Sequence, residues 1–74
     1  MIDQQKRAAI KHPIAGDMWL TNRGMRLLTA ITPHASSRDR DEIEYQGIDG
    51  RKCRCSGRTF QKWAAASEYC GGPA

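Results

Sequence analysis

The sequence has no long apolar segment, no block of like charges and few aromatic side chains. No run approaches the roughly 18 apolar residues that a transmembrane helix needs, and residues 1–7 lack the apolar centre of a secretory signal. Hydrophobic residues make up only 39% of the 74, which is low for a globular domain but too high for a disordered chain. We therefore expect one small domain, residues 1–74, that is cytoplasmic and does not contact membranes.

Cysteines are scarce and odd in number. The three of them, Cys53, Cys55 and Cys70, do not suit a secreted disulfide framework, and in a reducing compartment they stay thiols. Cys53-x-Cys55 lacks the paired spacing of a zinc site, so we interpret both as small core residues and expect neither metal nor cofactor. Neither His12 nor His34 lies in a triad-like motif, so we expect no catalytic residues and no enzymatic activity.

The net charge of +4, from 12 Lys+Arg against 8 Asp+Glu, is dispersed along the chain. A basic arm that binds nucleic acid typically shows five or more consecutive basic residues, and no such run occurs. Basic residues do gather around the two predicted hairpins, where we take them as candidate partner-binding residues. They are Arg23, Arg26, Arg51, Lys52, Arg54 and Arg58.

Capping residues and apolar spacing predict a helix at each end of the chain. The N-terminal helix covers residues 3–11, with Asp3 as its cap and Pro13 beyond its end. The C-terminal helix is capped by Thr59, carries an apolar stripe, and ends at Gly71-Gly72. The predicted organisation is thus an N-terminal helix at residues 1–12, a body at residues 14–69 and a loose tail at residues 70–74.

Two hairpins are predicted between the helices. The first joins residues 18–21 to residues 25–32 through a turn at 22–24, where Asn and Gly tolerate positive φ. The second joins residues 42–46 to residues 52–56, because both segments alternate polar and apolar residues. Together they predict a small α+β domain with a curved, SH3-like antiparallel sheet of about four strands.

The alternation also predicts the register of the second hairpin. A two-residue loop at Asp49-Gly50 would place Tyr45 opposite Arg54 and divide the apolar residues between two faces. A three-residue loop, Ile48-Asp49-Gly50, places Tyr45 opposite Cys53 and puts Gly50 in the left-handed region. We predict the three-residue loop, which also sets Ile43 opposite Cys55 and Glu44 opposite Arg54.

The order of several short segments resembles that of small SH3-like β-barrel proteins from phage and prophage accessory regions. The resemblance covers about residues 14–66 and lies in Gly16-Asp17-Met18-Trp19, Arg23-Gly24-Met25-Arg26, Ile43-Glu44-Tyr45, Asp49-Gly50, Cys53 and Phe60-x-x-Trp63. It implies a strongly bent sheet closed by a short helical segment. It also implies a protein that binds host proteins or nucleic acid and blocks or redirects them, and it carries over no functional residue.

These observations favour a non-enzymatic phage or mobile-element accessory protein that binds and inhibits or redirects a host protein. The partner would belong to a defence or transcription complex. The alternative is a small basic DNA- or RNA-binding module. A third hypothesis is a dimerising module, in which the N-terminal helix forms a homodimer interface through Ile2 and Ile10; otherwise the protein is a monomer.

Overall fold

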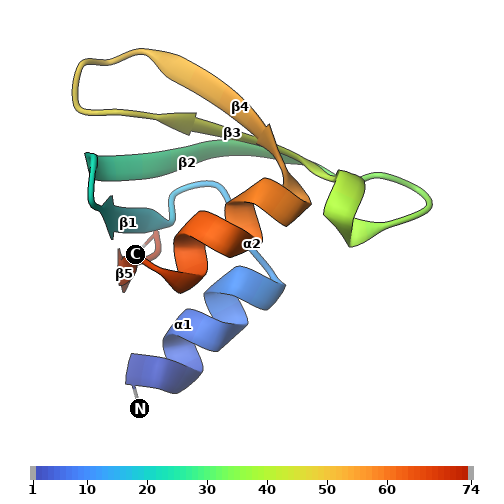
Figure 1. Ribbon diagram of the computed structural model, residues 1–74, viewed down its shortest axis with the longest axis horizontal. Helices are drawn as coiled ribbons and strands as arrows, with labels where there is room; N and C mark the ends of the chain where they lie inside the picture. The colour runs from blue at the N-terminus through green and yellow to red at the C-terminus, as the bar shows by residue number, and fades with distance from the viewer. Residues whose placement is uncertain (1, 74) are drawn as a thin grey trace.

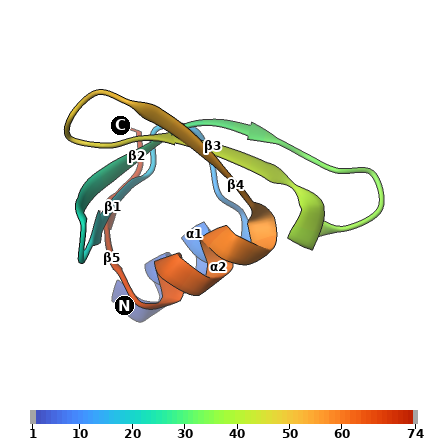
Figure 2. The ribbon, with the colours of Figure 1, turned by 45° about the horizontal axis from the view of Figure 1, so that its top comes forward.

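A curved antiparallel sheet of five strands bends around helix α2, and helix α1 lies beside α2 (Figure 1 and Figure 2). The computed structural model describes residues 2–73, with side chains from residue 4 onward. The strand order is β4-β3-β2-β1-β5, and the sheet is not closed into a barrel. The elements are α1 (Ile2–Lys11), β1 (Met18–Thr21), β2 (Gly24–Thr32), the 3-10 helix η1 (Arg38–Arg40), β3 (Glu42–Gln46), β4 (Lys52–Ser56), α2 (Gly57–Ala65) and β5 (Glu68–Gly71).

The core lies between the inner face of the sheet and α2. Trp19 is completely buried, and its ring lies 5.8 Å from Phe60 and 6.2 Å from Trp63, centroid to centroid. Both contacts are edge-to-face, which is a favourable arrangement for aromatic quadrupoles. Burial of these rings is the main source of stability in so short a chain. The other buried apolar residues are Ala9, Leu28, Ile43 and Ala64.

The register predicted for the second hairpin is confirmed. Tyr45 pairs with Cys53, Ile43 with Cys55 and Glu44 with Arg54. Gly50 adopts a φ of +83°, and its N–H donates to the carbonyl of Gly47 at 3.0 Å. This geometry is a type I turn followed by a bulge, which requires the left-handed conformation that glycine adopts without strain.

The first hairpin turns more tightly than predicted. Gly24 already pairs with Thr21, so the loop is the two residues Asn22 and Arg23. The hydroxyl of Thr21 donates to the carbonyl of Gly24 and accepts the N–H of Arg23, each at 3.0 Å. These two bonds hold the loop, and with it the backbone of Arg23, in one conformation.

Helix α2 begins earlier than predicted, because Ser56 and not Thr59 is its N-cap. The hydroxyl of Ser56 accepts the N–H of Thr59 at 3.2 Å. The N–H of Gly57 donates to the carbonyl of Asp41 at 2.7 Å, and the carbonyl of Arg38 lies where a Cβ at position 57 would be. Only glycine fits this close approach, which packs η1 against the start of α2.

The chain after α2 forms a fifth strand in place of the predicted end of the helix and the loose tail. Helix α2 ends at Ala65, and β5 pairs Tyr69 with Trp19 and Glu68 with Leu20. Cys70 and Gly71 therefore belong to the sheet. The predicted α+β class is confirmed, whereas the expected number of four strands is wrong because β5 adds to the free side of β1.

Helix α1 begins at Ile2, so Asp3 lies inside its first turn and is not its cap. Ile10 packs against the core, and Lys6 Nζ donates to the carbonyl of Ala65 at 2.9 Å. Ile10 thus contributes to the packing of its own chain, while the side chain of Ile2 lies outside the described residues. Neither helix within residues 2–73 has the length and apolar character needed to span a bilayer.

Candidate functional site

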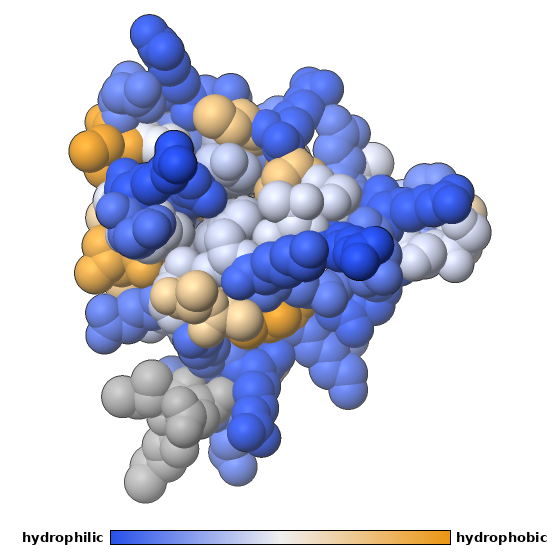
Figure 3. All heavy atoms as spheres, viewed as in Figure 1, coloured by the Kyte–Doolittle hydropathy of each residue, from blue (hydrophilic) through white to orange (hydrophobic). Residues whose placement is uncertain are grey.

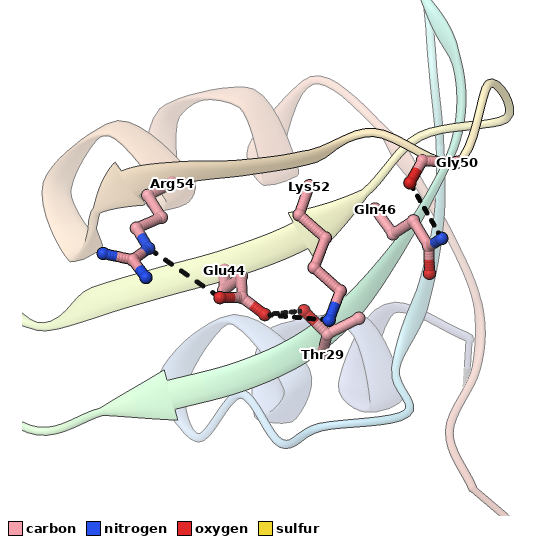
Figure 4. A network of polar contacts seen from close by, with 6 residues as sticks. All are labelled: Thr29, Glu44, Gln46, Gly50, Lys52 and Arg54. Carbon is pink, nitrogen blue, oxygen red and sulfur yellow. Dashed lines mark hydrogen bonds and ion pairs between the residues drawn. The ribbon is translucent and has the colours of Figure 1, made fainter.

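The six candidate basic residues lie in different parts of the surface. Lys52 and Arg54 are on the outer face of β4, beside Glu42 and Glu44 of β3, and Figure 4 shows both basic side chains next to Glu44. Arg54 lies 3.3 Å from Glu42 and 3.7 Å from Glu44, and Lys52 lies 3.9 Å from Glu44. Glu44 also accepts the hydroxyl of Thr29 at 2.8 Å. Carboxylates therefore offset part of the positive charge of Lys52 and Arg54, although both basic side chains are exposed and such pairs are weak.

Arg26 lies on the inner face of the sheet, between two aromatic rings. It pairs with Trp19 across β1 and β2, and residues directly opposite in an antiparallel pair share a face. Its guanidinium carbon is 4.7 Å from the ring centre of Tyr45 and 4.9 Å from that of Trp63. Cation–π attraction to two rings, one on a strand and one on α2, holds this guanidinium in place.

Two adjoining hollows meet at Arg26. One, of about 470 Å³, reaches toward Thr59 and Trp63 of α2. The other, of about 480 Å³, reaches toward the loop between β3 and β4. Arg23, Arg26 and Tyr45 line both. We call the combined feature the arginine groove and define it by Arg23, Arg26, Tyr45, Arg51, Cys53 and Trp63.

The structure brings together three of the six candidate residues, Arg23, Arg26 and Arg51. Arg51 lies 3.7 Å from Asp49, but both side chains are exposed, and such surface pairs contribute little. Arg58, in the first turn of α2, is exposed and lies outside the lining of the groove. The predicted patch therefore divides into the groove, the outer face of β4 and the isolated Arg58.

The titratable groups beside Arg26 are protonated at neutral pH, and burial moves them further from ionisation. Burial raises the pKa of Tyr45, although the positive charge of Arg26 opposes the shift. Burial likewise raises the pKa of Cys55, against the opposing effects of the Trp63 indole and Arg26. The phenol and the thiol therefore stay protonated, and neither supplies a negative charge to Arg26 or a thiolate nucleophile.

The two cysteines of β4 have different surroundings. Cys55 packs against the core, as predicted, but Cys53 is exposed and lines the arginine groove. The prediction of Cys53 as a core residue is wrong because Cys53 lies nearer the hairpin loop, where the inner face borders the groove. Cys70 on β5 is exposed as well. Among the described side chains, those of residues 4–73, no three His, Cys, Asp or Glu gather closely enough to hold a metal ion.

The outer face of the sheet carries an apolar surface that the sequence analysis did not identify. We call it the apolar rim and define it by Met18, Leu20, Met25, Leu27 and Ile48. Ile48 is 79% exposed and Leu20 41% exposed. Apolar side chains gather at the left margin of Figure 3, where Figure 1 places β1 and the loop between β3 and β4. The sequence feature that indicates this surface is Met18-Trp19-Leu20, because three consecutive apolar residues place apolar side chains on both faces of one strand.

The apolar rim and the arginine groove are continuous. A shallow hollow of about 130 Å³ on the rim is lined by Met25 and Ile48, and both residues also line the loop side of the groove. Ile48 lies over Gly24, with its Cδ1 within 3.6 Å of the position of a Cβ there. One ligand could therefore contact apolar side chains and arginines at the same time.

A separate hollow of about 510 Å³ lies between α1 and β5, and the buried Asp17 is part of its lining. The Asp17 carboxylate accepts the N–H of Ile14 at 3.1 Å and the hydroxyl of Tyr69 at 3.2 Å. Both carboxylate oxygens are thus engaged in joining the chain before β1 to β5. We assign this hollow to the packing of the fold.

Comparisons with known proteins assign no relative to this fold and groove. No protein-family model matches the chain. Searches among curated proteins and among solved structures likewise give no significant match. The groove, the rim and their continuity are consequently the observations from which a function can be inferred.

Proposed function

We propose that this protein is a non-enzymatic binding protein that recognises a partner protein through the apolar rim and the adjoining arginine groove. The observation that carries the proposal is the continuity of these two surfaces at Met25 and Ile48. Contiguous exposed apolar side chains on a small domain mark interaction sites, because they are excluded from water when a partner covers them.

A different protein suits this surface better than a second copy of the same chain. The chain carries a net charge of +4, so two copies repel each other at low ionic strength. Near the groove, Glu42 and Glu44 are already engaged with Arg54 and Lys52. A partner that contributes carboxylates would complement the unpaired Arg26.

The biological setting is proposed from the resemblance of residues 14–66 to SH3-like proteins of phage accessory regions. In that setting the partner is a host protein of a defence or transcription complex, bound in the host cytoplasm and inhibited or redirected. Binding of nucleic acid is the less supported alternative. Lys52 and Arg54 are paired with carboxylates, so less unpaired positive charge is available for phosphate contacts.

No catalytic step is included in the proposal. The Cys55 thiol is partly buried and its pKa is raised, which opposes nucleophilic attack. The Nδ1 atom of His34 accepts the N–H of its near neighbour Ser36 at 3.2 Å in an exposed loop, which is a local turn contact. The proposal is therefore limited to binding.

The test is affinity capture from a bacterial host lysate with matched variants. The double variant Leu20→Gln/Ile48→Gln removes the apolar rim, and Ile14→Gln changes an exposed apolar residue outside it. We expect a specific protein that the wild type and Ile14→Gln both retain and the double variant loses. If no captured protein depends on Leu20 and Ile48, the proposed function is wrong.

A further inference from the structure

Arg26 is a preorganised cation without a carboxylate partner among the described side chains, those of residues 4–73. It is partly buried, and two rings hold its position, yet among these residues it makes no ion pair and its side chain makes no hydrogen bond. Removing part of its hydration is unfavourable unless other contacts compensate. The aromatic rings contact the guanidinium but accept no strong hydrogen bond from its N–H groups.

The geometry favours a planar anion as the missing partner. The rings of Tyr45 and Trp63 are inclined at 63° to each other, so the guanidinium can lie flat on only one of them. Its N–H groups can form a paired contact with the two oxygens of a carboxylate. Arg23 adds positive charge to the same groove, whereas the charge of Arg51 is partly offset by Asp49, which lines the same hollow and lies 3.7 Å from it. At neutral pH the phenol of Tyr45 supplies no compensating negative charge, because even an unperturbed tyrosine is protonated there and burial raises the pKa of Tyr45 further.

We infer that the arginine groove binds an acidic peptide segment of the partner protein, with a carboxylate on Arg26 and an apolar side chain against Met25 and Ile48. This inference rests on the proposed function and specifies the chemistry of the partner. Charge complementarity identifies the occupant of the groove, and the adjoining apolar rim accounts for the second kind of side chain.

A peptide fits the groove better than single-stranded nucleic acid. Base stacking needs open aromatic faces. Arg26 lies against both Tyr45 and Trp63, and Trp63 also contacts Trp19 and Phe60 edge-to-face. The rings of the groove are therefore already in contact with other side chains, while the guanidinium N–H groups have no hydrogen-bond partner among residues 4–73.

The inference is tested by NMR titration of the 15N-labelled protein with defined probes. The acidic probe is a synthetic peptide of Glu-Glu-Leu repeats, and the control probe has Gln-Gln-Leu repeats of the same length. A thymidine oligonucleotide is the nucleic-acid probe. We expect saturable shifts of the Trp63 indole signal and the Arg26 side-chain signal with the acidic peptide, and weaker binding as salt increases.

Variants distinguish the effect of the position of the guanidinium on binding from the effect of net charge. Arg26→Gln weakens binding of the acidic peptide about tenfold or more. Arg26→Lys keeps the charge but loses the planar fork, so it also weakens binding. Arg7→Gln, on the exposed face of α1, removes the same charge and leaves the affinity within about twofold. If Arg26→Gln disturbs the fold, Arg23→Gln can be used to test the groove instead, because Arg23 makes no cation–π contact with the two rings.

Three results would overturn the inference: no saturable shift at about 1 mM acidic peptide, equal binding of the Gln-Gln-Leu peptide, or tighter binding of the oligonucleotide. Each can be told apart from failure of the proposed function. A captured partner that depends on Leu20 and Ile48 but not on Arg26 would leave the apolar rim as the interface and remove the groove from it.

Discussion

The hydroxyl of Tyr69 donates a hydrogen bond of 3.2 Å to the buried carboxylate of Asp17, a residue 52 positions away. The same carboxylate accepts the N–H of Ile14 at 3.1 Å. A buried carboxylate is tolerated only when such donors replace water. This contact therefore links the segment before β1 to β5 and fixes where β5 joins the sheet.

Replacing Tyr69 with Phe tests this link. Tyr69→Phe removes one donor from a buried carboxylate, so we expect a loss of about 1–3 kcal/mol in the free energy of unfolding. Urea denaturation followed by circular dichroism measures the change. Tyr45→Phe is the matched control, because the hydroxyl of Tyr45 does not contact Asp17. A Tyr69→Phe variant as stable as the wild type would contradict the role of this bond.

Alkaline pH should weaken the fold through the same tyrosine. Burial, with the charge of Asp17 and the hydrogen bond to it, raises the pKa of Tyr69 above its ordinary value. The folded state therefore holds this proton more tightly than the unfolded state, and its stabilisation is complete below about pH 10 and decreases above it. Denaturation across this range should show a smaller loss in Tyr69→Phe. An equal loss would assign the alkaline transition to other groups.

Gly57 should tolerate no side chain. In Gly57→Ala the new methyl group would overlap the carbonyl of Arg38, so either η1 or the start of α2 must move. We expect a loss of about 1–3 kcal/mol, typical of overpacking. Arg58→Ala, at the next residue, is exposed and should be nearly neutral. A Gly57→Ala variant that melts at the wild-type temperature would show that the contact is easily relieved.

The two tryptophans should differ in their contribution to stability. Trp19 is completely buried, so Trp19→Ala should cost about 3–5 kcal/mol and leave little folded protein. Trp63 is partly exposed beside the groove, and Trp63→Ala should cost less. Thermal melts of the two variants test this order, and Trp19→Phe provides a milder change if Trp19→Ala does not fold. A greater loss in Trp63→Ala would contradict the assigned core.

The charges on the outer face should make a small, salt-dependent contribution. Glu44→Gln removes the carboxylate that lies near Lys52 and Arg54 but keeps an oxygen for the Thr29 hydroxyl. Because these pairs are partly exposed, we expect a loss of about 1 kcal/mol or less at low salt. Denaturation at low and high salt measures it. A loss that persists unchanged in about 1 M salt would point to packing in place of charge.

Local patterns predicted the β3–β4 hairpin correctly. Its register follows from keeping Tyr45 and Ile43 on one face, and the left-handed conformation of Gly50 follows from the loop that this register requires. Both are short-range consequences of alternation and turn chemistry. The same reasoning predicted that Glu44 lies opposite Arg54, which the ion pair between them bears out.

The fifth strand could not be predicted in this way, because its partner is remote in sequence. Glu68-Tyr69-Cys70 follows an alanine-rich stretch that favours helix, and pairing with β1 overrides this local preference. The candidate site was predicted only in part for a similar reason. Arg26 and Arg54 are both arginines within strand-forming segments, so the sequence does not distinguish them. The sheet places Arg26 between two aromatic rings and Arg54 beside two carboxylates.

The pairing of β5 with β1 also has a consequence for the synthesis of this protein. Strand β1 emerges from the ribosome before its neighbour β5, because β2, β3, β4 and α2 lie between them in the chain. The sheet and the Asp17–Tyr69 contact therefore cannot be completed during translation until residue 71 is outside the ribosome. Until then β1 keeps an open edge, which nascent-chain chaperones can cover and other unfinished chains can pair with.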